Sequence, residues 1–225
     1  MSETVDVVVV GAGVVGCSVA HYLAANGASV SIVEREAIGS GSSAHATGSI
    51  SLLGTEFSPG PSFQLGLAGY REFAELVPSL EQETGIDLLF QRRPSLRLAL
   101  DEEEESLIKG LMTWQQEFVA MKWIGGDEVR RIEPRLAPNI IGAAHEDESV
   151  QLDSYRLNLA LATAAEKRGA RLVLREVTGL LTEARRVTGV RTAGGDISCG
   201  TVVLAAGAWS ACFGHWLDFP IPVRP

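Results

Sequence analysis

A glycine-rich loop, Gly11-Ala-Gly-Val-Val-Gly16, follows directly after an apolar run of valines at positions 7–10. These spacings suit a strand-to-helix turn that binds a pyrophosphate. Gly11 permits a tight exit from the strand, Gly13 lets phosphate approach backbone N–H groups, and Gly16 allows the helix to pack closely on the sheet. The phosphates then lie at the positive end of a helix. We therefore expect a βαβ unit whose first helix runs from Val14 to about Ala25.

An acidic residue, Glu34, ends the next apolar segment 18 residues after Gly16. This is close to the spacing of the carboxylate that binds ribose hydroxyls in dinucleotide-binding folds. A carboxylate at this position repels a 2′-phosphate, which argues against NADP. The glycine loop and Glu34 together predict a bound adenine dinucleotide, and they leave both FAD and NAD open.

The composition fits a folded globular protein. The 225 residues are 46% hydrophobic and 21% charged, enough for one large or two small domains. A formal charge of -9 without a concentrated Lys/Arg block argues against a nucleic-acid partner. The N-terminus has no basic region and its apolar run is too short to span a membrane, so we expect a cytoplasmic location. The cysteines, Cys17, Cys199 and Cys212, have no ligands at metal-binding spacing, so we expect no metal.

The middle of the chain changes character. From Ile86 to Leu100, apolar and charged residues alternate, which favours half-buried antiparallel strands. We expect a helix before this segment, from Ser62 to Val77 and ended by Pro78. Asp101 is expected to cap the helix that follows, with Leu107 on its buried face.

Signals of a parallel α/β unit return in the last third of the chain. Asp153 is expected to cap a helix ended by Gly169, and β-rich segments follow from Arg171. The last of these, Thr201–Leu204, leads into Ala205-Ala-Gly-Ala-Trp-Ser210. This second strand-to-glycine junction is similar to the first.

From Val5 to Pro225 the sequence resembles the flavin-dependent amine and amino-acid oxidoreductases, the family of D-amino-acid oxidase, glycine oxidase, sarcosine oxidase and dimethylglycine dehydrogenase. Five motifs in order carry the resemblance: the glycine loop with its preceding valines, Val33-Glu-Arg35, the Ser/Gly loop ending Ala46-Thr-Gly48, Gln151-Leu-Asp153, and the distal Val202-Val-Leu-Ala-Ala-Gly-Ala-Trp-Ser210.

The resemblance implies FAD as the cofactor. It places Glu34 on the ribose, Arg35 near the adenine, the loop from Ser42 to Gly48 along the pyrophosphate and flavin, and the Val177 backbone at the adenine. The cofactor-binding residues that it implies are Gly11, Gly13, Val14, Val15, Gly16, Glu34, Arg35, Ser42, Ser43, His45, Ala46, Thr47, Gly48, Val177, Ala206, Gly207 and Trp209.

The resemblance also implies the fold class: an α/β, Rossmann-type FAD-binding domain interrupted by an antiparallel α+β substrate domain. We expect the FAD-binding domain to comprise residues 1–85 and 151–225, and the substrate-domain portion residues 86–150.

The implied reaction is oxidation of the C–N bond of an amino acid or secondary amine, with hydride transfer to the flavin. The sequence identifies no catalytic residue. Family members continue beyond the position of Pro225, so we expect a C-terminal portion to be lacking and a second chain to be able to supply it. An NAD-dependent dehydrogenase and a catalytically incomplete flavin-binding or partner-binding module remain alternatives.

His45 lies where some family members place a histidine that is covalently attached to the flavin. Those members have a tryptophan before the histidine, whereas this chain has Ala44. A polar loop residue or a phosphate hydrogen-bond donor is the competing interpretation. The sequence leaves the covalent linkage open.

Overall fold

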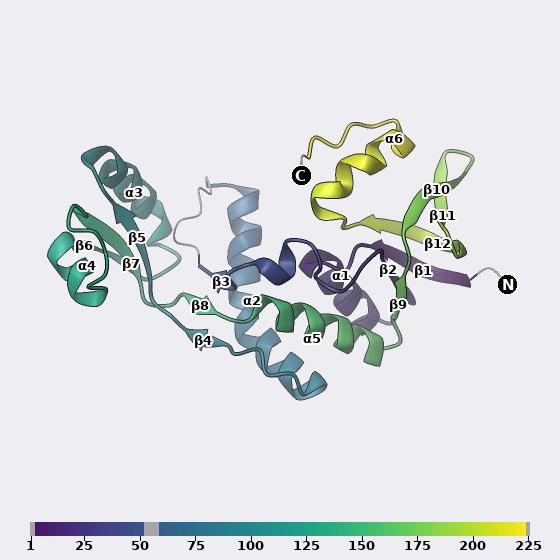
Figure 1. Ribbon diagram of the computed structural model, residues 1–225, viewed down its shortest axis with the longest axis horizontal. Coiled ribbons are helices and arrows are strands. Elements are labelled where there is room, and N and C mark those ends of the chain that lie inside the picture. Colours follow the sequence, from purple (N-terminus) through teal and green to yellow (C-terminus); the bar gives the residue numbers. More distant parts are fainter. Residues whose placement is uncertain (1–2, 52–58, 224–225) are drawn as a thin grey trace. The chain divides into compact units, whose positions relative to one another are not determined.

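The structure is a computed structural model that describes residues 3–51 and 59–223 (Figure 1). The chain divides into two compact units. The first comprises Met1–Ala46, Ser79–Leu88 and Asp153–Pro225, and the second comprises Thr47–Pro78 and Leu89–Leu152. The domain boundaries expected after residues 85 and 150 remain predictions, and in this division residues 47–78 also belong to the inserted unit.

The first unit is built on a six-stranded sheet of order β10-β11-β12-β1-β2-β9. Strands β12, β1, β2 and β9 are parallel, whereas β10, β11 and β12 pair antiparallel. The elements of this unit are β1 (Glu3–Val10), α1 (Val14–Ala25), β2 (Val30–Glu34), the 3₁₀ helix η1 (Ser43–His45), α5 (Ser154–Lys167), β9 (Arg171–Leu174), β10 (Val177–Glu183), β11 (Arg186–Thr192), β12 (Gly195–Leu204), the 3₁₀ helix η2 (Gly207–Phe213) and α6 (Gly214–Leu217).

The register brings the carboxyl ends of the parallel strands to one edge. Val10 of β1 lies opposite Leu204 of β12 on one side and Val33 of β2 on the other. Glu34 lies opposite Leu174 of β9. Ligands of open α/β sheets bind outside this carboxyl edge, so the register determines where a site forms.

Both faces of this sheet are covered, as a valine-rich parallel strand requires. Val8 and Val10 pack with Ile197 and Phe213 in one cluster, and the intervening Val9 is also fully buried. Helices α1 and α5 pack against each other, and η2 and α6 follow β12 (Figure 1). Helix α1 has the predicted bounds and ends at Asn26, followed by a glycine with positive φ.

The second unit contains two three-stranded antiparallel sheets, of order β3-β8-β4 and β5-β7-β6. Helix α3 packs Ile108 and Met112 on one face of β5-β7-β6, and α4 packs Val129 on the other. The elements are β3 (Ser49–Ile50), β4 (Gln91–Arg92), β5 (Ser95–Ala99), α3 (Glu102–Gln115), β6 (Met121–Gly125), α4 (Gly126–Ile132), β7 (Gly142–Glu146) and β8 (Val150–Gln151).

Two expectations about helices are wrong. Helix α2 (Pro61–Thr84) continues through Pro78 instead of ending there. Proline in a helix interior removes one hydrogen bond, at a cost of about 3 kcal/mol. Burial of Val77 and Leu80 beside the proline offsets it. In α3, Leu107 is 56% exposed, and the buried stripe is Ile108, Met112 and Gln115, one residue further along.

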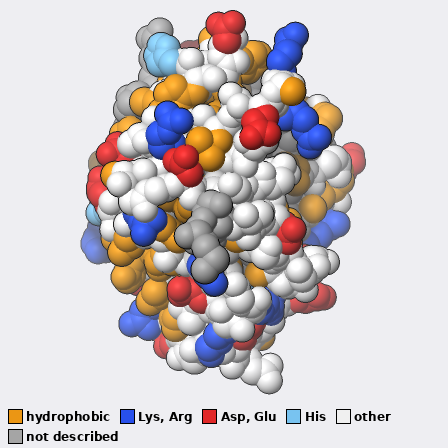
Figure 2. All heavy atoms as spheres, turned by 90° about the vertical axis from the view of Figure 1, so that its right-hand side faces the viewer, with side chains coloured by type: hydrophobic (Ala, Val, Ile, Leu, Met, Phe, Trp, Pro, Cys, Tyr) orange, Lys and Arg blue, Asp and Glu red, His pale blue; other side chains and the backbone are white. Residues whose placement is uncertain are grey.

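The fold class is confirmed: a parallel α/β unit is interrupted by an antiparallel α+β unit. Lys/Arg and Asp/Glu side chains are interspersed on the face shown in Figure 2, without a large patch of either sign. No described helix is long and apolar enough to cross a membrane.

Candidate functional site

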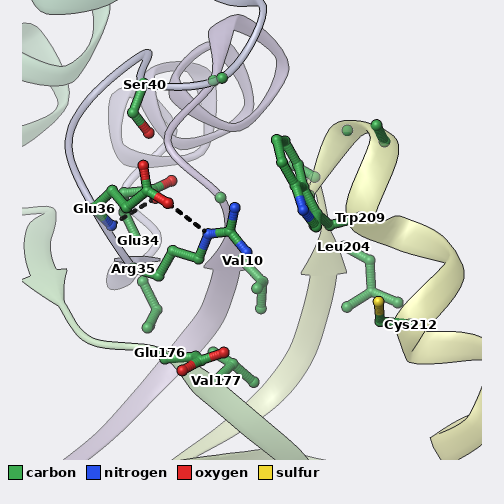
Figure 3. A pocket seen from close by; sticks show the side chains of 18 of the residues that line it. Val10, Glu34, Arg35, Glu36, Ser40, Glu176, Val177, Leu204, Trp209 and Cys212 are labelled. Atoms are coloured by element: carbon green, nitrogen blue, oxygen red, sulfur yellow. Dashed lines mark hydrogen bonds and ion pairs between the residues drawn. The ribbon is translucent and has the colours of Figure 1, made fainter. Parts of the chain in front are cut away.

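A cavity of about 660 Å³ opens at the carboxyl edge of the first unit's sheet (Figure 3). This volume lies in the range of small-molecule and cofactor sites. The wall is formed by the glycine loop, the segment after β2, the start of β10 and the segment after β12. The lining residues are Val10, Gly11, Gly13, Val14, Val15, Val33, Glu34, Arg35, Glu36, Ser40, Gly41, Ser42, Ser43, Arg175, Glu176, Val177, Thr178, Leu204, Ala205, Ala206, Gly207, Ala208, Trp209, Cys212, Phe213 and Trp216.

The two strand-to-glycine junctions are packed against each other. Gly11 has φ +106°, and a Cβ there would lie 2.5 Å from the carbonyl oxygen of Ala205. A Cβ on Gly16 would lie 1.9 Å from the carbonyl oxygen of Gly11. Side chains at either position would clash with backbone, so glycine permits the loop to lie between α1 and the end of β12.

Glu34 holds the glycine loop from the end of β2. Its Oε2 accepts a 2.8 Å hydrogen bond from the Ala12 N–H, and its Oε1 accepts one of 3.0 Å from the Glu36 N–H. An ionised carboxylate has about four acceptor positions. Glu34 therefore fixes the loop and keeps further acceptor positions for hydroxyl groups of a ligand in the cavity that it lines.

Ser43 lies at the N-terminus of α1. Its Oγ accepts a 3.0 Å hydrogen bond from the Val14 N–H, and a Cβ on Gly13 would lie 3.1 Å from the same oxygen. A hydroxyl that accepts one bond still has a proton to donate. Ser43 can therefore present a donor to an anion where the helix macrodipole is also favourable.

Arg35 extends from the end of β2 toward Trp209 of η2 (Figure 3). Its Cζ lies 4.4 Å from the centre of the Trp209 ring, and its Nε lies 3.2 Å from Glu36 Oε1. A cation–π contact at an exposed site contributes about 0.5–1 kcal/mol. The Arg35–Trp209 pair thus links two sides of the cavity by a contact weak enough to open.

These features suit a phosphorylated nucleotide, as the sequence predicts: a carboxylate for hydroxyl groups, a hydroxyl and a helix N-terminus for phosphate, and an arginine beside an aromatic ring. Comparison with known proteins specifies it further. The family described as FAD dependent oxidoreductase (DAO) matches residues 6–225. The chain belongs to this family.

Individual relatives agree. Glycine oxidase of Geobacillus kaustophilus is 31% identical over 229 residues, covering 100% of this chain and 60% of that protein. Its crystal structure matches with a TM-score of 0.91 at 31% identity, again over 100% of this chain and 61% of that one. Mitochondrial dimethylglycine dehydrogenase of Rattus norvegicus is 29% identical over 227 residues, covering 99% of this chain and 26% of that protein.

A third relative is the hydrogen cyanide synthase subunit HcnC of Pseudomonas aeruginosa, which is 26% identical over 263 residues, covering 100% of this chain and 63% of that protein. The chain thus spans about 60% of the length of the glycine oxidase that it matches. Family membership confirms the predicted resemblance and decides the choice that the glycine loop left open: the cofactor is FAD.

Most of the residues predicted to bind FAD come together at the cavity. Twelve of them line it: Gly11, Gly13, Val14, Val15, Glu34, Arg35, Ser42, Ser43, Val177, Ala206, Gly207 and Trp209. Gly16 is buried behind the loop, where it allows the close packing described above. His45 and Ala46 follow the lining segment without lining the cavity, and Thr47 and Gly48 fall in the second unit. FAD binding by each residue remains a prediction.

His45 is exposed at the end of η1. Its Nδ1 lies 2.9 Å from the carbonyl oxygen of Gly41, so this nitrogen donates a proton to the carbonyl. The preceding turn therefore fixes the ring and leaves Nε2 as the nitrogen that has a lone pair. This geometry is compatible with both a polar loop residue and a site of flavin attachment.

Several cavity residues were not expected from the sequence. Ser40 and Gly41 precede the predicted loop segment, and Glu176, Thr178 and Arg175 flank Val177. A wider window around each predicted motif would have found these. Cys212 and Phe213 come from η2 and Trp216 from α6, and no local pattern in the sequence marks them as cavity residues.

The thiols differ in environment. Cys17 is fully buried under the glycine loop, where its Sγ donates to the Ala12 carbonyl at 3.4 Å. Burial, with the negative charge of Glu34, raises the pKa of Cys17 to about 12. Burial likewise raises the pKa of Cys199, whereas Cys212 is exposed at the cavity. Within residues 3–51 and 59–223, no group of three or more His, Cys, Asp or Glu is arranged to hold a metal ion.

Proposed function

We propose that this chain is the FAD-binding part of an oxidoreductase that oxidises the C–N bond of an amino acid or secondary amine by hydride transfer to the flavin. The observation that carries the proposal is the convergence of the Glu34 carboxylate, the Ser43 hydroxyl and the N-terminus of α1 on one cavity. When bound, FAD supplies the electron-accepting ring for such an oxidation. The protein binds and orients it.

The pyrophosphate of FAD would bind at the N-terminus of α1. The Gly13 N–H has no acceptor among the described residues, and the Ser43 hydroxyl keeps a proton to donate. Backbone N–H groups at a helix N-terminus and a hydroxyl are the donors that phosphate oxygens require.

The adenosine part would bind between Glu34 and the start of β10. Glu34 has free acceptor positions for the two ribose hydroxyls. Val177 lines the cavity at the start of β10, where an extended backbone can present its N–H and C=O to an adenine edge. Arg35 can stack on the adenine, because a planar guanidinium stacks on aromatic rings and this one lies beside the cavity over the ring of Trp209.

The substrate class is proposed from the relatives, which are named glycine oxidase and dimethylglycine dehydrogenase. The proposal includes a second chain as a partner in the active enzyme. One relative, HcnC, is named as a subunit of its synthase.

Visible absorption of the purified chain tests the proposal. We expect a yellow protein, or one that becomes yellow when FAD is added, with a flavin spectrum that gel filtration does not remove. A colourless chain that fails to bind added FAD would refute the proposal. Turnover of glycine, sarcosine and D-amino acids is then compared with and without a candidate partner chain, and turnover by the pair alone supports the two-chain enzyme.

Acid precipitation of the same protein decides the role of His45. Flavin that stays in the pellet indicates covalent attachment, and flavin in the supernatant indicates a polar loop residue. If the wild-type flavin is acid-stable, we expect His45→Ala to release it. His215→Ala is the matched control, because His215 lies in α6 and does not line the cavity.

A further inference from the structure

We infer that Asn158, in the second turn of α5, is a positioning residue for the cofactor: it orients the peptide whose N–H meets the pyrophosphate. This inference rests on the FAD site proposed above. Asn158 is fully buried, and it lies 146 positions along the chain from the glycine loop that it contacts.

The contact is with the backbone of the loop. Asn158 Nδ2 donates a 3.2 Å hydrogen bond to the carbonyl oxygen of Ala12. The same oxygen accepts 2.9 Å from the Gly39 N–H and 3.4 Å from Cys17 Sγ. On its other side, the Ala12 N–H donates to Glu34. Both polar groups of Ala12 are therefore held, from four different segments of the chain.

Holding this carbonyl determines where the next N–H points. A trans peptide is planar, with its C=O and N–H directed to opposite sides. The Ala12 C=O is directed toward Asn158 and Gly39, so the Gly13 N–H is directed away from them. Gly13 lines the cavity, and its N–H has no acceptor among the described residues. Asn158 thus aims a free donor at the position where phosphate is proposed to bind.

The amide oxygen of Asn158 indicates that this residue is not present for stability alone. Its Oδ1 is buried and has no hydrogen-bond partner in the described part of the chain. A buried acceptor without a partner is destabilising, whereas an apolar residue of the same shape avoids this cost. Leucine at position 158 would avoid this cost, so the asparagine is explained by its bond to the loop.

The neighbouring loop is shaped around this side chain. Gly39 has φ +71°, and a Cβ there would lie 2.8 Å from Asn158 Nδ2. The absence of a side chain at position 39 leaves room for the amide to reach Ala12. The segment that leads from β2 to Ser43 and the glycine loop are therefore tied to the same asparagine.

The test compares two ligands that differ in phosphate. ADP and adenosine are titrated by calorimetry into the wild-type chain, Asn158→Leu and Asn158→Ala. Leucine removes both amide groups and keeps the approximate size, and alanine removes them together with most of the side chain. For both variants we expect ADP affinity to fall about five- to tenfold, the loss of one hydrogen bond, and adenosine affinity to change less than twofold. The melting temperature of Asn158→Leu should be unchanged or raised.

The control is His21→Leu, which also removes a buried polar side chain with an unpartnered nitrogen, on the neighbouring α1. It should leave the ratio of ADP to adenosine affinity unchanged. The inference is overturned if the Asn158 variants weaken both ligands equally, weaken neither, or both fail to fold. A wild-type chain that binds neither FAD nor ADP refutes the proposed function together with this inference, whereas normal FAD binding with an unchanged ratio refutes the inference alone.

Discussion

Gly16→Ala should destabilise the protein, whereas the same substitution at an exposed helix position of this chain should stabilise it. In an exposed helix, Gly→Ala normally stabilises by about 0.5–1 kcal/mol, because glycine has more conformational entropy to lose. Gly110 in α3 is such a position: it is exposed, and a Cβ there meets nothing within 4 Å. We expect Gly110→Ala to be stabilising by that amount.

At Gly16 the same methyl group has no room. The added Cβ would lie 1.9 Å from the Gly11 carbonyl oxygen, 3.0 Å from its carbon and 3.4 Å from Ala205 Cβ. The first two contacts are with backbone, so only a shift of α1 by about 1 Å or more relieves them, a degree of overpacking that costs about 1–3 kcal/mol or more. This cost exceeds the gain in helix propensity, so Gly16→Ala should be net destabilising.

The shift of α1 should also displace the N–H groups at its N-terminus, so FAD binding should weaken together with stability. Urea unfolding followed by far-UV circular dichroism measures the stability of both variants, and titration of FAD by flavin fluorescence measures binding. The stabilities of the two variants should differ by about 1–3 kcal/mol or more, with Gly110→Ala above wild type and Gly16→Ala below it. Equal stabilisation by Gly16→Ala and Gly110→Ala, with FAD affinity unchanged in both, would show that the close contact at Gly16 does not exist in solution.

Three further predictions concern single side chains. Glu34→Gln should weaken FAD binding about tenfold, because an amide has only one oxygen to replace the two that hold the Ala12 and Glu36 N–H groups. An unchanged FAD affinity in a flavin-fluorescence titration would contradict the proposed role of the Glu34 carboxylate. One thiol, Cys212, should react with a disulfide reagent at pH 8 in the native chain, because burial raises the pKa of Cys17 to about 12 and raises that of Cys199. FAD should slow the reaction of Cys212, which lies at the cavity. Fast modification of Cys17 in a peptide map would contradict the structure. Burial, with the charge of Arg168, lowers the pKa of His21 below its ordinary value, so the unfolded chain binds the proton more tightly and stability should fall as the pH drops below about 6.5. His21→Gln should make the free energy of unfolding less dependent on pH in this range. An equal pH dependence in wild type and His21→Gln would refute the role of His21.

Several helix ends were predictable in both units because their signals are local. The glycine loop begins α1 and Asn26 ends it, as the sequence indicates. The two predicted aspartate caps are also confirmed: Asp101 accepts from the Glu104 N–H, and Asp153 accepts from the Arg156 N–H. Such interactions involve residues three or four apart, so a single sequence contains all the information they need.

The remaining features depend on contacts that no local pattern encodes. Pro78 reads as a helix terminator, yet burial on both sides of it keeps α2 continuous. Trp216 and Cys212 line the cavity because the chain after β12 turns back over the strand ends. Asn158 is the one polar residue among the buried positions of α5, and only the packing of α5 against α1 brings its amide to Ala12.

The same contacts imply that the glycine motif is not a binding site by itself. Gly11 packs against Ala205 at the end of β12, and the Ala12 carbonyl is held by Asn158 of α5. Both partners come from the last third of the chain, after the inserted second unit. The N-terminal βαβ segment supplies the backbone N–H donors. The residues that set the direction of these donors, Asn158 and Ala205, follow more than 140 positions later in the chain. Cofactor affinity should therefore depend on folding of the whole first unit, and a fragment that contains the complete glycine motif but ends before Asp153 should bind ADP no better than adenosine.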